Sequence, residues 1–195
     1  MFFWTVKILF YPLLWLYFKT KIYGKQNRKS KGRIIVMANH LSIRDPILLD
    51  LHFPRQPIYI AKAELFKYKF FGFILKKLGA FEVRRGVSDI GAVRTALRVL
   101  NEERVLGIFP EGGRRTELSQ FESGIVKLAL KTDTKIIPVY IGGKYGLFSR
   151  ARLAYGEHID LKSITKGEKP TPELTEKCLE YLMNETIKLK GIVER

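Results

Sequence analysis

A histidine followed five residues later by an aspartate comes directly after an apolar run. The run covers residues 33–38, and His40 and Asp45 follow it in the segment NHLSIRD. A loop of this length can fold back so that the carboxylate holds one imidazole nitrogen and leaves the other free as a base. No Gly-x-Ser-x-Gly segment occurs, and the single cysteine, Cys178, lies far along the chain. A catalytic histidine here would deprotonate a substrate rather than a protein nucleophile, whereas a histidine near an aspartate, taken alone, is usually an ordinary surface or core pair.

Two further apolar runs end in glycine and arginine. Residues 105–109 lead into PEGGRR at 110–115, and residues 80–83 lead into RRG at 84–86. Glycines let a backbone approach a ligand closely, and the forked donors of arginine match phosphate oxygens. Neither segment is a Walker loop, because the lysine followed by serine or threonine is missing. Taken singly, each segment is also explained as a turn with solvated charges.

A fourth segment is an apolar run interrupted by a proline. Residues 135–141 read KIIPVYI, with Pro138 in the middle. Proline lacks the N–H that a ladder hydrogen bond needs, so within sheets it occurs at edge strands and bulges. We expect this run to be a strand of that kind and to shape a wall of the site.

The N-terminal segment is apolar and aromatic. Its longest uncharged part covers only residues 8–18, whereas a helix needs about 20 residues to cross a bilayer. No basic region precedes the segment and no small-residue cleavage site follows it, which argues against a signal peptide. Aromatic residues typical of membrane interfaces lie within it, and basic residues follow it: Trp4, Tyr11, Trp15 and Tyr17, then Lys19, Lys21, Lys25, Arg28, Lys29, Lys31 and Arg33.

These features predict two parts in the chain. Residues 1–32 are expected to form a short helix on the cytoplasmic membrane surface and then a basic linker over 19–32. Residues 33–195 are expected to form the catalytic domain, because a chain of 195 residues is most simply one domain. An apolar helix that caps the core is the alternative for the N-terminus.

The composition restricts the partners. The formal net charge is +16, which suits nucleic acid, an anionic membrane or phosphorylated substrates. The aromatic residues gather in the apolar N-terminus rather than among the basic residues, so a stacking platform for nucleic acid is not evident and no nucleic-acid partner is expected. One cysteine excludes a disulfide framework.

Strand-like and helix-like segments alternate after the linker, which predicts an α/β fold with a mixed, mostly parallel sheet flanked by helices. In such sheets, sites gather in the loops beyond the strand ends. The segment from residue 161 onward carries no catalytic signal, and we interpret it as structural closure. The predicted strands are 33–38, 57–61, 80–83, 105–109, 135–141 and 151–155, and the predicted helices are 46–51, 70–78, 89–101, 124–131 and 172–189.

Together, the four segments resemble in order and spacing the four sequence blocks of the glycerolipid acyltransferase family, in particular its bacterial 1-acyl-glycerol-3-phosphate acyltransferases. The resemblance covers about residues 34–141, and a segment at 61–66 also resembles one that the family carries between its first two blocks. The matching positions are Asn39, His40 and Asp45; Gly79, Phe81, Val83 and Arg85; Phe109, Pro110, Glu111, Gly112 and Arg114; and Ile137, Pro138 and Val139.

The resemblance implies roles for these residues. His40 would be the general base on a glycerol hydroxyl, and Asp45 would orient it. Arg85 would bind the phosphate of the acceptor, with Arg114 as a second ligand. The other substrate-binding positions implied are Asn39, Lys62, Glu111 and Gly112, of which Glu111 would hold a glycerol hydroxyl or fix its loop.

Two positions depart from the family pattern. Gly113 replaces the usual threonine and removes a hydroxyl, but its backbone amide remains. Arg84 stands beside Arg85, and the register of the family favours Arg85. We therefore expect altered ligand contact at Gly113 and retained activity.

The activity implied is transfer of an acyl group from an acyl thioester, on acyl carrier protein or coenzyme A, to the sn-2 hydroxyl of lysophosphatidic acid. The product would be phosphatidic acid, and neither a metal nor a cofactor is expected. The alternatives are another acceptor (glycerol-3-phosphate, a lysophospholipid or lyso-ornithine lipid) or an inactive basic membrane-binding protein of the same fold. The presence of both His40 and Asp45 speaks against the inactive protein.

Overall fold

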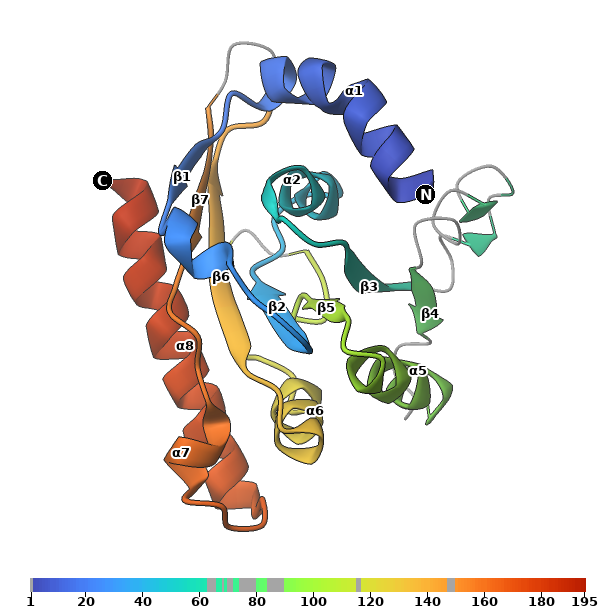
Figure 1. The fold of residues 1–195 in the computed structure, drawn as a ribbon. Helices are drawn as coiled ribbons and strands as arrows, with labels where there is room; N and C mark the ends of the chain where they lie inside the picture. The colour runs from blue at the N-terminus through green and yellow to red at the C-terminus, as the bar shows by residue number, and fades with distance from the viewer. Residues whose placement is uncertain are drawn as a thin grey trace.

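The computed structural model describes residues 2–62, 66–67, 69, 72–73, 80–83, 90–114, 117–146 and 150–195. A seven-stranded sheet in the order β1-β7-β6-β2-β5-β3-β4 forms the centre of this described part (Figure 1). Neighbouring strands are parallel except β6 and β7, so β1 and β7 run opposite to the others. The predicted mixed, mostly parallel sheet is confirmed. Its strands are β1 Lys21–Tyr23, β2 Ile34–Ala38, β3 Pro57–Lys62, β4 Phe81–Val83, β5 Val105–Ile108, β6 Ile136–Gly143 and β7 Ala151–Tyr155.

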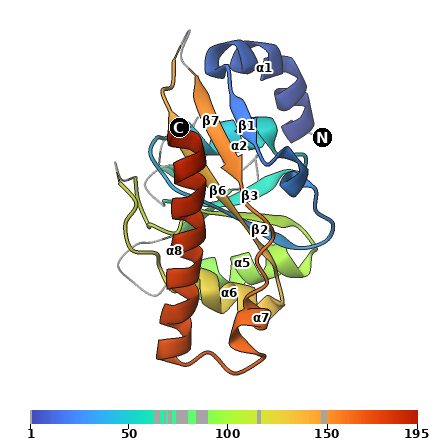
Figure 2. The same ribbon diagram turned by 90° about the vertical axis from the view of Figure 1, so that its left-hand side faces the viewer.

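Helices cover both faces of the sheet (Figures 1 and 2). The end of α1 and the whole of α2 pack on one face, and α5, α6 and α8 pack on the other. The turn η1 follows β1, and the short α7 precedes α8. The bounds are α1 Phe2–Phe18, η1 Lys25–Arg28, α2 Asp45–His52, α5 Ile90–Asn101, α6 Gly124–Thr132, α7 Leu161–Thr165 and α8 Pro172–Glu194.

Strand β2 contributes to the core on both faces, and all of its residues are buried. Ile35 and Met37 join the core shared with α5, α6 and α8. Ile34, Val36 and Ala38 join the core shared with α1 and α2. Successive side chains of a strand point to opposite faces, so a strand covered on both sides is apolar throughout. The carboxyl end of this strand is therefore held rigidly.

The C-terminal helix α8 lies along β6 and β7 (Figure 2). It begins with a cap in which Thr171 Oγ1 accepts a hydrogen bond from Leu174 N at 3.1 Å, and Pro172 fits its first turn. Leu189 and Val193 pack against the sheet. The helix closes one side of the fold, as predicted for this segment.

All six predicted strands are confirmed, with ends that differ by at most two residues. The helix predicted over 70–78 lies outside the described residues except at 72–73. The other four predicted helices correspond to α2, α5, α6 and α8, and α8 extends to Glu194. The short elements β1, η1 and α7 were not predicted, because three to five residues give too little periodicity to recognise.

The predicted linker needs a correction at residues 21–23. These residues form β1, which pairs in parallel with β7 and places Ile22 opposite Leu153. Ile22 packs against the core, while Lys21 is exposed. The basic composition of the segment thus concealed a strand in which Ile22 and Tyr23 pack against two core clusters.

Of the two expectations for Pro138, an edge strand or a bulge, the structure shows the bulge. Pro138 lies in β6, between β2 and β7, so it is not at an edge. A bulge is present between two residue pairs, Val139–Tyr155 and Ile136–Ile159. Between these pairs β6 spans three residues and the segment opposite it spans four, so the opposite segment carries one extra residue. The shift places the missing N–H of Pro138 where the ladder is already interrupted.

Helix α1 has two unlike sides. Near its end, Phe18 is buried and Leu14 and Tyr17 pack against the core. Its other side exposes Ile8, Leu9, Leu13, Trp15 and Leu16, among other large apolar residues. Within the described part of the chain, none of the helices combines the length and apolarity that crossing a bilayer requires.

Candidate functional site

The carboxyl ends of three adjacent strands bring the predicted segments together. β6, β2 and β5 are neighbours and run parallel, so their last residues meet at one edge of the sheet. His40 follows β2, Glu111 follows β5, and Tyr145 follows β6. Loops beyond this edge are where α/β sheets place their sites.

His40 and Asp45 form the pair that the sequence predicts. His40 Nδ1 lies 2.9 Å from Asp45 Oδ2, and the Asp45 side chain is fully buried. The same oxygen accepts backbone hydrogen bonds from Leu41 N and Ser42 N, each at 2.7 Å. A carboxylate on Nδ1 favours the tautomer with the proton there, which leaves Nε2 as the base. The His40 side chain is 17% exposed, so a substrate can reach it.

Asp45 is also the first residue of α2. A carboxylate at a helix start lies near the positive end of the helix dipole and is stabilised there. Pro46 follows in the first turn, where a missing N–H costs nothing. The order Asp-Pro thus starts a helix and fixes the carboxylate that holds His40.

The second Asp45 oxygen is held by a residue that the sequence analysis missed. Tyr145 Oη donates a hydrogen bond to Asp45 Oδ1. Burial, followed by the charge of Asp45, raises the pKa of Tyr145 above its usual value, so the phenol keeps its proton and remains a donor. Tyr145 also meets the edge of the Phe18 ring at 6.0 Å. The only signal in the sequence is a tyrosine just after a strand that ends in two glycines.

Asn39 clamps two strands together. Asn39 Nδ2 donates to Ile141 O at 2.9 Å, and Ile141 N donates to Asn39 Oδ1 at 2.7 Å. The side chain is 2% exposed. These contacts give Asn39 a structural role, and its predicted contact with substrate stays a prediction. Asn39 holds the end of β2 against β6 and thereby positions His40.

Glu111 and Phe109 support the histidine from the β5 side. Glu111 Oε2 accepts a hydrogen bond from His40 N at 3.2 Å, and Glu111 is 6% exposed. Of its two predicted roles, the structure shows the fixing of the loop. The Phe109 ring stacks on the imidazole with centroids 4.3 Å apart, and Tyr59 stacks behind Phe109 at 5.8 Å. The imidazole is therefore held at its face as well as at Nδ1.

Gly112 has a backbone that favours glycine. Its φ is 62°, in the left-handed region, and its N–H donates to Phe109 O at 3.3 Å. The turn reverses the chain directly after Glu111. Gly113 and Arg114 follow, and Arg114 is exposed beside the site.

The predicted phosphate ligands lie partly beyond the described structure. Arg85 lies outside the described residues, directly beyond β4, whose carboxyl end is at the same edge of the sheet. Lys62 ends β3, and its side chain is likewise outside the description. Their substrate-binding roles stay predictions.

The described side chains offer a general base and no evident metal centre. Within residues 2–62, 90–114, 117–146 and 150–195 and the short described pieces between them, no three His, Cys, Asp or Glu side chains group as metal ligands would. The His40–Asp45 pair can take a proton from a bound hydroxyl and return it to a leaving group. The same pair serves many reactions, so its geometry alone does not name the substrate.

Comparison with known proteins narrows the reaction class. The Acyltransferase family model matches residues 19–142, more than half of the chain. The chain is 35% identical over 131 residues to a 1-acyl-sn-glycerol-3-phosphate acyltransferase of Borreliella burgdorferi, which covers 65% of the chain and 52% of that protein. It is 32% identical over 137 residues to a protein of the same description from Bacillus subtilis, covering 68% of the chain and 69% of that protein.

A solved structure is similar over nearly the whole chain. It is the crystal structure of the 1-acyl-sn-glycerophosphate (LPA) acyltransferase from Thermotoga maritima, with a TM-score of 0.75 and 26% identity. The match covers 99% of this chain and 80% of that one. The chain thus spans about half the length of the Borreliella burgdorferi relative and most of the length of the Thermotoga maritima structure.

Proposed function

Because the chain belongs to the acyltransferase family, we propose that it moves a fatty acyl group from an acyl thioester to the sn-2 hydroxyl of lysophosphatidic acid, which gives phosphatidic acid. The observation that carries the proposal is the His40–Asp45 pair, with its 2.9 Å contact and a partly exposed imidazole at the carboxyl edge of the sheet. The names of the relatives supply the substrate class.

The proposed mechanism uses His40 twice. Its Nε2 takes the proton of the acceptor hydroxyl as the hydroxyl oxygen attacks the thioester carbonyl. The tetrahedral intermediate then breaks its carbon–sulfur bond, and the thiolate takes the proton from the imidazolium. One ester and one free thiol result. General-base assistance of this kind contributes about 10²–10⁴-fold.

Asp45 and Tyr145 prepare the base. Asp45 holds the Nδ1 proton and stabilises the imidazolium, and Tyr145 and two backbone amides hold Asp45. A fixed arrangement needs little reorganisation when charge develops. The thioester is itself an activated acyl group, so the proposed reaction requires neither a metal nor a cofactor.

The turn after β5 and the arginines would bind the polar parts of the substrates. Gly112 N already donates to Phe109 O, so we propose Gly113 N as the donor for the oxyanion. Arg85 would bind the acceptor phosphate, with Arg114 and Lys62 as further cations. Gly113 lacks the threonine hydroxyl of the family pattern, and a backbone amide at this position is sufficient for the role.

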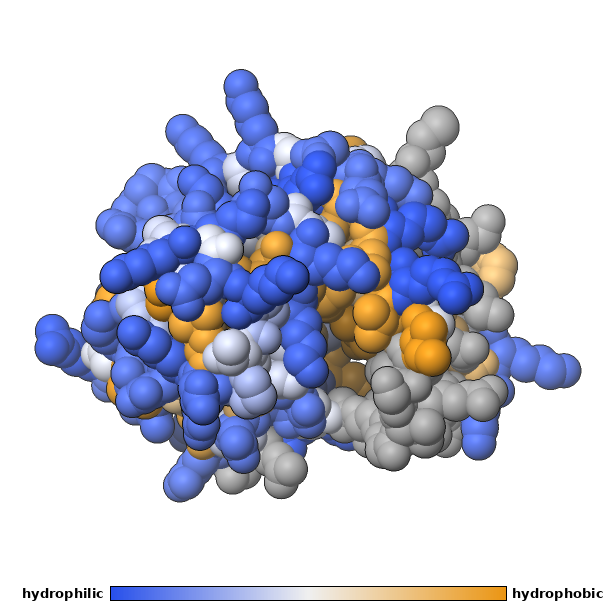
Figure 3. Space-filling view, turned by 90° about the horizontal axis from the view of Figure 1, so that it is seen from below, coloured by the Kyte–Doolittle hydropathy of each residue, from blue (hydrophilic) through white to orange (hydrophobic). Residues whose placement is uncertain are grey.

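The outer side of α1 supports a location at the cytoplasmic membrane surface. Ile8, Leu9 and Leu13 are 73%, 68% and 65% exposed. By contrast, the face seen from below is mostly hydrophilic, with apolar patches between charged side chains (Figure 3). A helix that exposes apolar and aromatic residues on one side fits the interface of a bilayer, from which a lipid acceptor would be taken. The net charge of +16 would attract anionic lipids and an acidic acyl carrier.

One assay tests the proposal and its alternatives. Purified protein in liposomes is given acyl carrier protein or coenzyme A thioesters, together with lysophosphatidic acid, glycerol-3-phosphate, a neutral lysophospholipid or lyso-ornithine lipid in separate reactions. Phosphatidic acid formed from lysophosphatidic acid supports the proposal, and the ratio of the two donors identifies the carrier. Product formed only from one of the other acceptors would identify that molecule as the substrate in place of lysophosphatidic acid. Absence of free thiol with every acceptor would favour an inactive membrane-binding protein.

A further inference from the structure

A pocket of about 390 Å³ lies at the opposite end of α2 from the catalytic pair. Four cations line it: Lys7 of α1, Lys25 and Arg28 of η1, and Lys29. His52 and Phe53, at the end of α2, form its floor. Since α2 starts at Asp45 and ends at His52, about 10 Å of helix separates this pocket from the catalytic aspartate. The pocket is therefore no part of the site described above.

Two of the four cations bind backbone carbonyl groups at the end of α2. Arg28 Nη1 donates to His52 O at 2.6 Å, and Lys7 Nζ donates to Phe53 O at 2.9 Å. Cations near the last carbonyl groups of a helix are favourable. Lys25 and Lys29 have no such role, although they line the same pocket.

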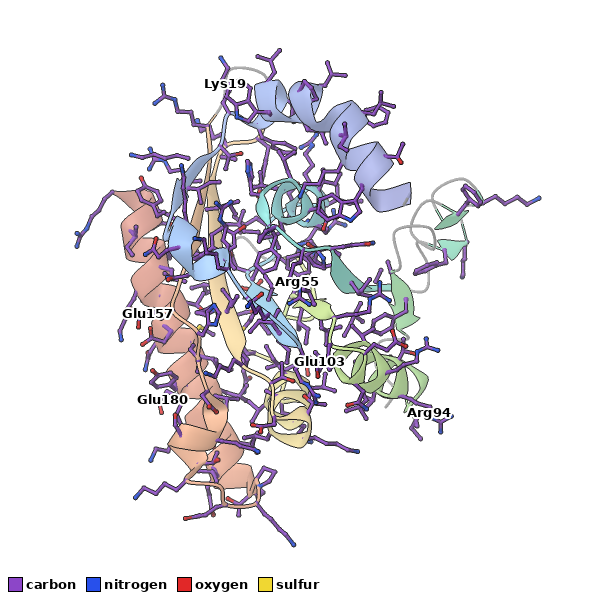
Figure 4. The ribbon with its side chains drawn as sticks, in the orientation of Figure 1. Lys19, Arg55, Arg94, Glu103, Glu157 and Glu180 are labelled. Atoms are coloured by element: carbon purple, nitrogen blue, oxygen red, sulfur yellow. The ribbon has the colours of Figure 1, made fainter. Side chains whose placement is uncertain are left out.

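Three of the four cations of the pocket have no carboxylate partner in the described part of the chain. Among the residues that the structure describes, no carboxylate forms an ion pair with Lys25, Arg28 or Lys29. A neighbouring cluster differs, because Glu103 pairs with Arg33. Arg55, labelled with Glu103 in Figure 4, donates to Glu103 O at 2.7 Å. The cations of that cluster lie beside a carboxylate, whereas Lys25, Arg28 and Lys29 form no ion pair in the described part of the chain.

Two buried groups beside the pocket have pKa values shifted toward their neutral forms. Burial, opposed by a hydrogen bond from Tyr59 and the charge of Lys7, raises the pKa of Asp50 to about 8. Burial and the nearby charges of Arg28, Lys7 and Lys25 lower the pKa of His52 to about 4. Asp50 therefore contributes little negative charge to the pocket, and the cations of the pocket help to lower the pKa of His52.

We propose that this pocket binds the phosphate of an anionic membrane lipid, at a second phosphate site separate from that of the acceptor. Lysine and arginine donors match phosphate oxygens in charge and geometry. Lys7 belongs to α1, whose other side exposes apolar residues, so a bilayer that receives α1 brings lipid headgroups to the level of the pocket. The inference rests on the proposed membrane location and is independent of acyl transfer.

The test removes the two cations that hold no helix carbonyl. The full-length double variant Lys25→Gln/Lys29→Gln is compared with Lys169→Gln/Lys177→Gln, which removes the same charge from exposed positions far from the pocket. Binding to phosphatidylcholine vesicles with a fixed fraction of phosphatidic acid should fall about tenfold or more for the first variant, since each lysine near the surface contributes about 1 kcal/mol. It should fall much less for the second. Equal losses would mean general charge attraction and would overturn the proposal.

A second readout separates a lipid phosphate from free phosphate. Inorganic phosphate is titrated into the protein in nonionic detergent while the imidazole resonances of His52 are followed by NMR. Saturable shifts in the wild type that are absent from Lys25→Gln/Lys29→Gln support a phosphate site. The phosphate concentration at which the shifts saturate shows whether free phosphate binds tightly enough to compete with the lipid phosphate of vesicles. No shift with phosphate or with phosphatidic acid in micelles overturns it. Acyl transfer to solubilised lysophosphatidic acid should be unchanged in this variant, so failure here is distinct from failure of the proposed function.

Discussion

The two ends of α2 bury ionisable side chains in opposite situations. At its start, Asp45 accepts hydrogen bonds from His40, two backbone amides and Tyr145. At its end, His52 Nε2 is buried without a hydrogen-bond partner in the described part of the chain. Both side chains are buried, but only the first has partners that hold it in one functional orientation. Burial provides rigidity, and the hydrogen-bond partners decide whether a buried group can serve chemistry.

The largest difference between the two ends should be in catalysis. His40→Ala should lower acyl transfer by about 10²–10⁴-fold, because it removes the base, while His52→Leu should retain most activity. Thiol release from the acyl donor measures the rate, and circular dichroism checks that both variants fold. Equal rates for His40→Ala and the wild type would exclude the proposed mechanism.

The end of α2 should dominate a different property, the acid stability of the fold. The pKa of His52 is lowered to about 4 in the folded state, so the unfolded state takes up a proton first as the pH falls. Above pH 6.5 the imidazole is neutral in both states, and its contribution to the free energy of unfolding is fully present. Between pH 6.5 and about 4 this contribution is lost, which lowers the free energy of unfolding by at most about 3 kcal/mol.

The variant His52→Leu isolates this effect. Urea unfolding at a series of pH values should show that its stability falls less than that of the wild type between pH 6.5 and 4. Asp50 titrates in both proteins, so its contribution cancels in the difference. Parallel curves would mean that His52 takes up its proton at the same pH in the folded and the unfolded protein, and that burial does not lower its pKa.

The contacts at the start of α2 were largely predictable from the sequence, and those at its end were not. The spacing of His40 and Asp45 and the apolar run before them predicted both the strand and the ion pair, because short-range spacing determines a loop. The pocket depends on α1, η1 and the end of α2, which are separated in the sequence. Only folding brings Lys7 within reach of Phe53.

The same reason explains Asn39 and Tyr145. The partner of Asn39 is Ile141, 102 residues away, and the partner of Tyr145 is Asp45, 100 residues away. A single sequence carries no signal for such pairs. The place of Asn39 in the motif predicted a ligand, and its two bonds to Ile141, which the structure adds, make it a clamp.

The clamp gives the next prediction. Asn39→Ala should destabilise the fold by about 2 kcal/mol, because Ile141 N and O are left buried without their partner. Activity at low temperature should fall less than in His40→Ala, since the base itself remains. Thermal unfolding measures the first effect. An unchanged midpoint would show that these two bonds contribute little to stability and would contradict the role of Asn39 as a clamp.

The smallest expected effect concerns Tyr145, and it asks how strictly Asp45 must be held. Tyr145→Phe removes one donor to a charged acceptor but retains the ring that packs on Phe18. A hydrogen bond to a charged group contributes about 1.5–3 kcal/mol, so kcat should fall at least about tenfold with little change in KM.

The unfolding midpoint separates positioning from a loss of stability. A positioning role lowers kcat while KM and the thermal unfolding midpoint change little. Tyr140→Phe is the matched control, because Tyr140 Oη donates a hydrogen bond to Glu194 at 3.1 Å at the far side of the same strand. If both variants lower kcat equally, or if kcat falls only in step with the midpoint, Tyr145 only packs, and Asp45 needs no more than its backbone donors to hold the base.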